Sequence, residues 1–418
     1  MKLVVSMNHL TTALAEVTPV LNDALLQEEA KNVIFWVKDN IVKVVCNNLY
    51  TTCLADLECN LEFKEGESAS EERFILVKAK ELLNHLNCVS SLKMTKVDKI
   101  ELDVSDTEIR LYIYEVPAIE DDPNADRLTQ VSKYRLAKGK VVERIKVEIR
   151  NAVENASNTD AYINLNKTDM LVILDALIPA VKKETRDSVH TRVTFANDYV
   201  YVIPQTYAAL MHNELPEGVS DFIVQNSVAQ FMQSFFGIEE VTQFKKFTTN
   251  GDAVILVLKN TNATAVIKAM NASKAFNITN QKNIPESGFG ISKGYFADVL
   301  KRIANTGEEI AFKVVLAEDS TQSTCTIMNK VMNQQIPVWV SKGVGEYSFM
   351  VKPDLLASIT FSHLNDNATY LFFYLDKDET GKVTLCVTDD IMVASGAGHL
   401  WHTYTKGLAM SKGDYQWN

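Results

Sequence analysis

The chain has 418 residues, a formal net charge of −11 and a hydrophobic content of 46%. This length corresponds to about three domains of ordinary size, and the apolar content is enough for each of them to bury a core. The acidic balance argues against a protein that is basic over its whole surface, as general nucleic-acid binders usually are, although it leaves room for a basic patch inside an acidic shell.

Targeting signals and disulfides are not expected. The first residues are too short and too polar for a signal peptide, and no apolar run approaches the roughly 20 residues that a membrane span needs. The six cysteines form no C-x-x-C pair, and most of them lie in apolar segments whose sequence is typical of strands, as Cys46 and Cys386 do. Such thiols are typical of buried, reduced side chains, so we expect a cytoplasmic protein with no membrane association.

One helix pattern occurs three times along the chain. In its first copy the small polar residue Ser6 is followed by Leu10, Leu14 and Val17. A polar start followed by apolar residues at this spacing predicts an N-capped amphipathic helix. Because the pattern returns at long intervals, we interpret the chain as an array of one structural unit. The copies are 6–17, 166–177 with Met170, Leu174 and Leu177, and 292–303 with Phe296, Leu300 and Ile303.

Each of these helices is followed by two runs of alternating apolar and polar residues with a short polar turn between them. The alternation predicts half-buried strands that form a hairpin. Asp39 and Asn40 suit the first turn, because their side chains bond nearby backbone and tolerate left-handed conformations. The three predicted turns are 38–40, 196–198 and 318–320.

A second pattern lies inside each unit and consists of a short apolar strand, a polar break, a helix and a further hairpin. In its three copies, the strand, the break and the helix cover residues 74–86, 221–236 and 347–361. Each unit therefore reads as two strand–helix–strands modules, which gives six modules in the chain. Few helices among many antiparallel strands predict an α+β fold.

Two segments interrupt this rhythm and mark the predicted domain boundaries. The extended segment 117–157 begins with an acidic turn and continues into charged text that predicts either a surface helix or a strand extended into one. Residues 271–288 are polar and rich in Asn, as linkers are. We predict three similar domains, namely 1–157 with the extended segment, 158–284, and 285–418 with a C-terminal tail.

No catalytic or metal site emerges from the sequence. Residues 376–381 begin like a calcium loop, but Thr380 and Val387 occupy positions that should hold ligands, so a hairpin turn is the better interpretation. His399 and His402 stand near each other without a carboxylate or a cysteine beside them. Phosphate-binding and nucleophile motifs are absent. We therefore expect no cofactor, no metal and no enzyme activity.

Basic residues cluster at and near the predicted helices. In the third copy of the first pattern, Lys301 and Arg302 project away from the apolar face. If the helices share one side of the molecule, their outer faces can contact phosphates without reading sequence; the alternative is an ordinary solvated helix face. The candidate residues are Lys78, Lys80, Lys182, Lys183, Arg186, Lys245, Lys246, Lys293, Lys301, Arg302 and Lys352.

This order of modules resembles the bacterial-type DNA polymerase sliding clamp, the β subunit of the replicase. The likeness extends over about residues 1–405 and rests on pattern and order. It is clearest in residues 1–21, which resemble the family's first strand and helix, in 74–89, and in two blocks of the middle domain, 163–177 and 193–232. The resemblance implies two chains closed head to tail into a ring, with helices lining a central hole through which double-stranded DNA passes. It also implies a DNA polymerase and a clamp-loader ATPase as partners.

The sequence departs from the family at the groove where partners insert an apolar peptide. The family's T-D-G-H-R-L segment is replaced here by residues 203–209. The adjoining helix keeps apolar character, and the groove can be rebuilt from the residues around it or lie elsewhere. This divergence and the extended segment favour a clamp encoded by a phage over one encoded by a bacterium. The candidate groove residues are Ile173, Leu174, Tyr207, Ala208, Trp401 and Tyr404.

Two other interpretations stay open. A ring- or shell-forming structural protein can use the same repeat for assembly without binding DNA, and it has no reason to gather lysines on its helix faces. An enzyme would need a residue cluster that the sequence does not reveal. The distribution of basic residues separates the first of these from a clamp.

Overall fold

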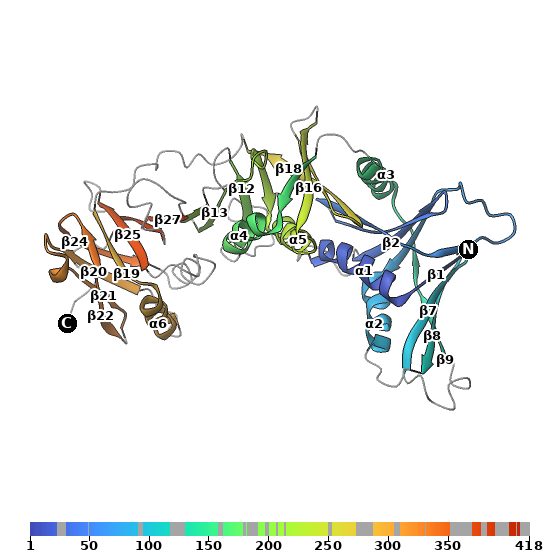
Figure 1. Cartoon of the computed structure of the whole chain (residues 1–418), viewed down its shortest axis with the longest axis horizontal. Coiled ribbons are helices and arrows are strands. Elements are labelled where there is room, and N and C mark those ends of the chain that lie inside the picture. The colour runs from blue at the N-terminus through green and yellow to red at the C-terminus, as the bar shows by residue number, and fades with distance from the viewer. Residues whose placement is uncertain are drawn as a thin grey trace. The chain divides into compact units, whose positions relative to one another are not determined.

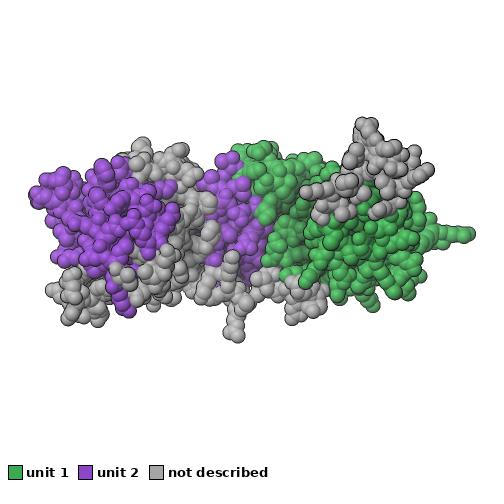
Figure 2. All heavy atoms as spheres, turned by 90° about the horizontal axis from the view of Figure 1, so that it is seen from below, with its two compact units in different colours: residues 1–167, 234–269 green, residues 168–233, 270–418 purple. Residues whose placement is uncertain are grey.

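The computed structural model divides into two compact units (Figures 1 and 2). Unit 1 contains residues 1–167 and 234–269, and unit 2 contains residues 168–233 and 270–418. The structure describes residues 1–22, 31–48, 50–90, 95–117, 130–157, 162–178, 181, 191–196, 200–205, 208–212, 215–249, 253–272, 287–304, 310–330, 332–351, 370–377, 383–388, 401–406 and 408–409. The predicted division into three domains stays a prediction.

Unit 1 contains a five-stranded antiparallel sheet in the order β5-β1-β7-β8-β9. Its first strand, β1, pairs on one side with β5 and on the other with β7. Strand β9 lies at one end of this sheet, where it pairs only with β8 among the described residues. The strands are β1 (Lys2–Val5), β5 (Asn60–Glu62), β7 (Thr95–Val104), β8 (Ile109–Pro117) and β9 (Gln130–Leu136).

A longer antiparallel sheet passes through the rest of unit 1. Its order is β10-β6-β2-β3-β4-β18-β17-β16-β11. The pairing of β4 with β18, in which Ala55 lies opposite Ala263, joins strands that are far apart in the sequence. The strands are β10 (Lys138–Gly139), β6 (Arg73–Lys78), β2 (Asn32–Lys38), β3 (Ile41–Asn47), β4 (Thr51–Asp56), β18 (Ala263–Asn271), β17 (Val254–Lys259), β16 (Val241–Thr248) and β11 (Ile163–Asn166).

Helices α1 (Met7–Val17) and α2 (Ala79–Ser90) pack against one face of this long sheet, and the short 3₁₀ helix η1 (Thr18–Asn22) follows α1. Ser6 caps α1, because its Oγ accepts a hydrogen bond of 3.1 Å from the backbone N–H of His9. Leu10, Leu14 and Val17 are all buried, as the pattern predicts. We call this side of the sheet the inner face.

Helix α3 (Glu143–Ser157) covers the opposite side, which we call the outer face (Figure 1). Successive side chains of a strand point to opposite sides of a sheet, so adjacent residues serve different helices. Trp36 joins the apolar cluster under α3 together with Ile149, whereas Cys53, on the inner face, donates its thiol toward the α1 carbonyl of Glu16. The charged part of the extended segment therefore forms the strands β9 and β10, followed by the surface helix α3.

Unit 2 contains a second long sheet, in the order β15-β12-β13-β14-β27-β26-β25-β19-β23. Here β14 pairs with β27, so that Ala209 lies opposite Tyr404. The strands are β15 (Phe222–Gln225), β12 (Arg192–Phe195), β13 (Val200–Gln205), β14 (Ala208–His212), β27 (Trp401–Lys406), β26 (Val383–Thr388), β25 (Tyr370–Lys377), β19 (Ser287–Ser292) and β23 (Val340–Lys342).

A five-stranded sheet in the order β22-β21-β20-β24-β28 completes unit 2. Helix α6 (Lys293–Ala304) buries Phe296, Val299 and Leu300, and the ring of Phe296 meets that of Phe373 edge-on at 5.2 Å. The remaining elements are the helices α4 (Lys167–Leu177) and α5 (Asn226–Phe236), the 3₁₀ helix η8 (Ser320–Gln322), and the strands β22 (Asn333–Pro337), β21 (Thr324–Met328), β20 (Ile310–Leu316), β24 (Gly345–Val351) and β28 (Leu408–Ala409).

Several local predictions are confirmed. Asp39 and Asn40 adopt positive φ angles of 51° and 62° in the hairpin turn between β2 and β3. Met170, Leu174 and Leu177 form the buried face of α4. The predicted turn at 318–320 contains Asp319, which caps η8 between strands β20 and β21. Residues 197 and 198 of the turn at 196–198 and most of the linker at 271–288 lie outside the described residues.

Candidate nucleic-acid interface

The exposed face of α1 is polar and carries neither Lys nor Arg. Asn8, Thr12 and Ala15 follow one another at the spacing of one helix face, opposite the buried apolar stripe, and all three are exposed. Next to them, His9 lies 3.7 Å from the carboxylate of Glu58. Amide and hydroxyl groups of this kind bind phosphate oxygens without reading base sequence.

Helix α2 repeats this arrangement with one cation added. Lys80, Asn84 and Asn87 lie at the same helical spacing and are exposed. Lys78 ends strand β6 just before the helix, and its Nζ lies 3.9 Å from the Glu81 carboxylate. Lys80 therefore lies on this helix as predicted, whereas Lys78 belongs to the strand before it, which corrects its assignment to a helix.

Helix α6 of unit 2 carries the clearest cationic end. Lys301 and Arg302 lie in its last turn and are exposed, while Lys293 begins the helix and is half-buried. A cation in the last turn also interacts favourably with the helix dipole. The predicted exposure of Lys301 and Arg302 is confirmed, whereas their contact with DNA stays a prediction.

Two further predicted helix-face cations also lie in a strand. Lys245 and Lys246 belong to strand β16 and not to a helix, which corrects the sequence-based assignment. The cause is that α5 already ends at Phe236, after which the chain turns and enters the sheet. Lys245 lies over the Tyr162 ring at 5.7 Å, and Lys259 shares that ring from the same outer face. Lys182, Lys183, Arg186 and Lys352 lie outside the described residues.

The candidate partner groove stays a prediction, and the structure describes where several of its residues lie. Strands β14 and β27 do lie side by side, which brings Ala208 next to Thr405 and places Trp401 and Tyr404 on the neighbouring strand. Ile173 and Leu174, however, are 1% and 0% exposed and are core residues, which corrects their assignment to an open groove. The reason is that α4 turns both toward the interior, while Val172 is its exposed apolar residue. Tyr207 lies outside the described residues.

A buried carboxylate lies near the pairing of β4 with β18. Glu16 of α1 is 4% exposed, and its Oε2 has no hydrogen-bond partner among the described residues. Burial raises the pKa of Glu16 to about 7, and the neighbouring carboxylates of Glu239 and Asp56 act in the same direction, against a hydrogen bond from Asn262. The seam between these strands is therefore sensitive to the charge of one side chain.

Sequence reasoning missed the neutral, hydrogen-bonding faces of α1 and α2. The spacing in the sequence could have revealed these faces, because Asn8 and Thr12 are four residues apart, as are Lys80 and Asn84, and both pairs lie opposite the apolar stripes. Within the described ranges, no group of three or more His, Cys, Asp or Glu side chains has a geometry for metal binding. None of the described helices is long and apolar enough to cross a membrane.

Comparisons with known proteins identify the fold. No protein-family model and no curated protein sequence matches this chain. Solved structures do match over 98% of it: a protein from Eubacterium rectale assigned as a DNA polymerase III β subunit (11% identity, TM-score 0.70), the Caulobacter crescentus polymerase III β subunit (13%, 0.68) and the Bacillus subtilis DNA polymerase sliding clamp (9%, 0.67). In each case 100% of the matched chain is covered.

The predicted resemblance is thus confirmed at the level of the fold. The chain has the α+β architecture of the polymerase III β subunits, with antiparallel sheets and few helices. Because the sequence identities are low, this likeness establishes the fold, and activity has to be argued from the residues of this chain.

Proposed function

We propose that this protein is a DNA sliding clamp, which surrounds duplex DNA and tethers a replicative polymerase to it without performing chemistry. The observation that carries the proposal is that modules are joined in the same way twice, by pairing between their last strands. When the short strands β5, β10, β23 and β28 are set aside, each first-type module begins with β1, β11 or β19 and ends with β4, β14 or β22. Each second-type module begins with β6, β15 or β24 and ends with β9, β18 or β27.

Four of these six module ends already pair within the chain, in two pairs. The last strand of a first-type module pairs antiparallel with the last strand of a second-type module in both cases, β4 with β18 and β14 with β27. The remaining ends, β22 and β9, each terminate a five-stranded sheet. Unpaired edge strands invite pairing with another chain. Pairing β22 of one copy with β9 of a second repeats the seam and, applied twice, closes a head-to-tail dimer.

The helix faces support duplex DNA as the contents of such a ring. They offer Asn and Thr side chains together with Lys80, Lys301 and Arg302, which suits loose contact with phosphates and free sliding. The DNA polymerase and an ATP-dependent clamp loader are the partners that such a ring requires, and the cytoplasm of a bacterium or of a phage-infected cell is where it would act.

The edge-strand prediction is tested by the oligomeric state. Val131 on β9 is 39% exposed, and replacing it with Asp places a charge where the second copy would pair. We expect Val131→Asp to shift the protein from dimer to monomer in analytical ultracentrifugation. Ile41→Asp is the matched control, because Ile41 is an exposed residue of β3 and lies on neither of the edge strands β9 and β22; it should leave the dimer intact. A wild-type monomer at all concentrations contradicts the ring.

The topological prediction is tested on DNA. The wild-type protein, once loaded, should remain on circular plasmid and be lost from the same plasmid after linearisation. Equal retention on both overturns the clamp mechanism, and an assembled ring that is retained on neither supports a purely structural role.

The charge prediction uses two pairs of cations. Lys301→Ala with Arg302→Ala should lower the slope of log K against log salt by about one per lost phosphate contact. Arg144→Ala with Lys146→Ala, on α3 of the outer face, is the matched control and should leave the slope unchanged. Equal effects of the two pairs contradict a DNA site on the helix faces.

A further inference from the structure

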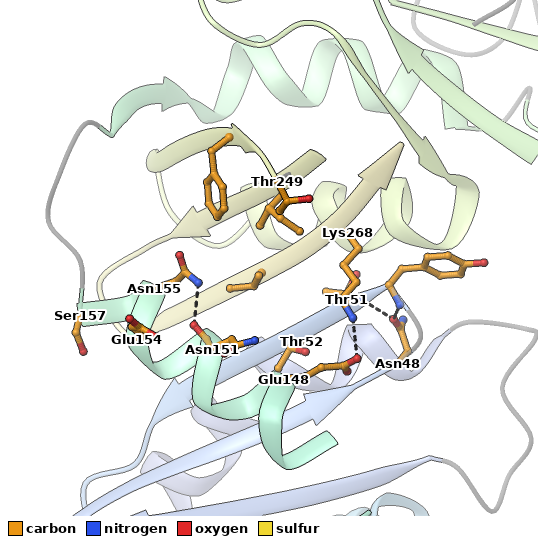
Figure 3. A pocket seen from close by; sticks show the side chains of 14 residues that line it. Asn48, Thr51, Thr52, Glu148, Asn151, Glu154, Asn155, Ser157, Thr249 and Lys268 are labelled. Atoms are coloured by element: carbon orange, nitrogen blue, oxygen red, sulfur yellow. Dashed lines mark hydrogen bonds and ion pairs between the residues drawn. The ribbon is translucent and has the colours of Figure 1, made fainter. Parts of the chain in front are cut away.

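A cleft lies beside α3 on the outer face of the long sheet of unit 1 (Figure 3). Its volume is about 570 Å³, which is within the range of sites that hold a small ligand or a few large side chains. One wall is the second half of α3, and the other side is formed by strands β16, β17 and β18 with the turn before β4. The cleft is on the other side of the sheet from α1 and α2.

The floor of the cleft is apolar. Phe247, Ile255 and Val266 come from three neighbouring strands; Phe247 lies opposite Ile255, and Val266 lies diagonally across from Ile255 on the same outer face. All three are only half-buried, in contrast to the wholly buried residues of the inner face. Beyond the end of α3, therefore, the sheet presents apolar surface that the described chain does not cover.

The rim of the cleft is polar and bears a net negative charge. Glu148 accepts hydrogen bonds from Lys268 at 2.7 Å and from Asn47 at 2.8 Å, so its charge is already matched. Glu154 is exposed and makes no ion pair within the described residues. Figure 3 shows Glu154 on the helix wall among Asn151, Asn155 and Ser157, which supply further donors and acceptors.

The helix wall is fixed in place before any ligand arrives. The carbonyl oxygen of Ala156 accepts a hydrogen bond of 2.9 Å from Lys259, and that of Asn155 accepts one of 3.1 Å from Tyr162. Toward the other end of α3, Arg150 pairs with Glu72 at 2.7 Å. A wall held in this way loses little conformational entropy on binding, which favours affinity.

We propose that this cleft binds a short peptide segment of a partner protein. A large apolar side chain of the peptide would cover the floor, its backbone amides would use the polar rim, and a Lys or Arg beside it would pair with Glu154. The apolar floor and the negative rim favour such a basic, apolar segment over a nucleic acid, whose phosphates Glu148 and Glu154 would repel. The site is distinct from the pairing of β14 with β27 and does not depend on the proposed clamp function.

The probe is a displayed library of random peptides, selected on the full-length chain and counter-selected on Asn151→Trp. Asn151 is exposed on the cleft wall, so the indole should fill the cleft without disturbing the core. We expect the enriched peptides to share an apolar residue next to Lys or Arg, and to bind Asn151→Trp at least about tenfold more weakly in fluorescence anisotropy. Val147→Trp adds the same ring on an exposed part of α3 outside the cleft and should leave binding unchanged.

Charge reversal separates the rim from the floor. Glu154→Lys should weaken the enriched peptides about fivefold, whereas Glu65→Lys, at an exposed glutamate away from the cleft, should not. Circular dichroism verifies that each variant is folded. Peptides that bind Asn151→Trp as tightly as the wild type, or that bind equally well to Glu154→Lys, overturn the proposal, as does a library that yields no peptide depending on the cleft.

Discussion

The two faces of the long sheet in unit 1 are built in different ways. The inner face meets α1 and α2 through almost wholly buried apolar residues such as Phe35 and Val44. The outer face meets α3 through a smaller cluster around Trp36 and Ile149, and ion pairs surround that cluster. One sheet therefore holds the repeated modules together on one side and attaches a charged helix on the other.

This difference teaches how the extended segment can be added without disturbing the repeat. Alternating residues of the same strands serve the two faces, so the outer face can gain a helix while the inner face keeps its packing. Helix α3 is surrounded by ion pairs of modest energy, and it leaves part of the outer face uncovered, which forms the cleft.

The largest effect is expected on the inner face. Phe35 is 0% exposed and lies between Val44 and Ile75 in the sheet. Phe35→Ala removes a large buried ring and should lower the free energy of unfolding by about 3–5 kcal/mol. Urea denaturation measures the loss, and hydrogen exchange should rise throughout β2 and β3.

The matching change on the outer face is Ile149→Ala. Ile149 is also 0% exposed, but it belongs to the smaller cluster under α3. We expect a loss of about 2–4 kcal/mol for the docking of α3 and faster exchange within that helix, while β2 and β3 keep their protection. If both variants raise exchange over the same residues, the two faces do not act separately.

An intermediate effect is expected from Glu16, which lies on the inner face. Its pKa of about 7 in the folded protein exceeds its ordinary value of 4.5, so the folded state binds the proton more tightly than the unfolded state. The contribution of Glu16 to stability is therefore fully present below pH 4.5 and is lost as the pH rises through 7. Glu16→Gln should stabilise the protein by about 1–2 kcal/mol at pH 8, with the gain vanishing near pH 4.5.

Thermal denaturation across this pH range measures the gain. Glu65→Gln, at an exposed carboxylate, is the control and should show no such pH dependence. A gain for Glu16→Gln that stays constant from pH 4.5 to pH 8 contradicts the buried, ionisable carboxylate.

The smallest effect is expected at the rim of the outer face. The Lys268 side chain is 51% exposed, and its Nζ lies 2.7 Å from Glu148. Because exposed ion pairs contribute little and are screened by salt, Lys268→Met should cost less than about 1 kcal/mol and nothing measurable in ~1 M NaCl. Exchange of the α3 amides at low and high salt checks this. A large loss that persists in salt would place the pair among the determinants of α3 docking.

Much of the fold was predictable because its signals are local. The capped helices beginning after Ser6 and Ser292, the left-handed turn at Asp39 and Asn40, and the buried stripe of α4 all follow from spacing and residue type. The candidate interface was predictable only where a cation lies on a helix, as Lys80 and Lys301 do. Lys245 was grouped with the helix-face cations although Gly237 directly follows α5, and it lies in strand β16.

The sequence by itself determined the repeated modules, the α+β class and the apolar face of each helix, since period and turn chemistry act over a few residues. Only the tertiary structure decided which strands meet, namely β4 with β18 and β14 with β27, because pairings between distant segments leave no local mark. It also decided that Ile173 and Leu174 are core residues and that α3 lies on the outer face. Burial depends on what packs against a side chain, and that partner comes from elsewhere in the chain.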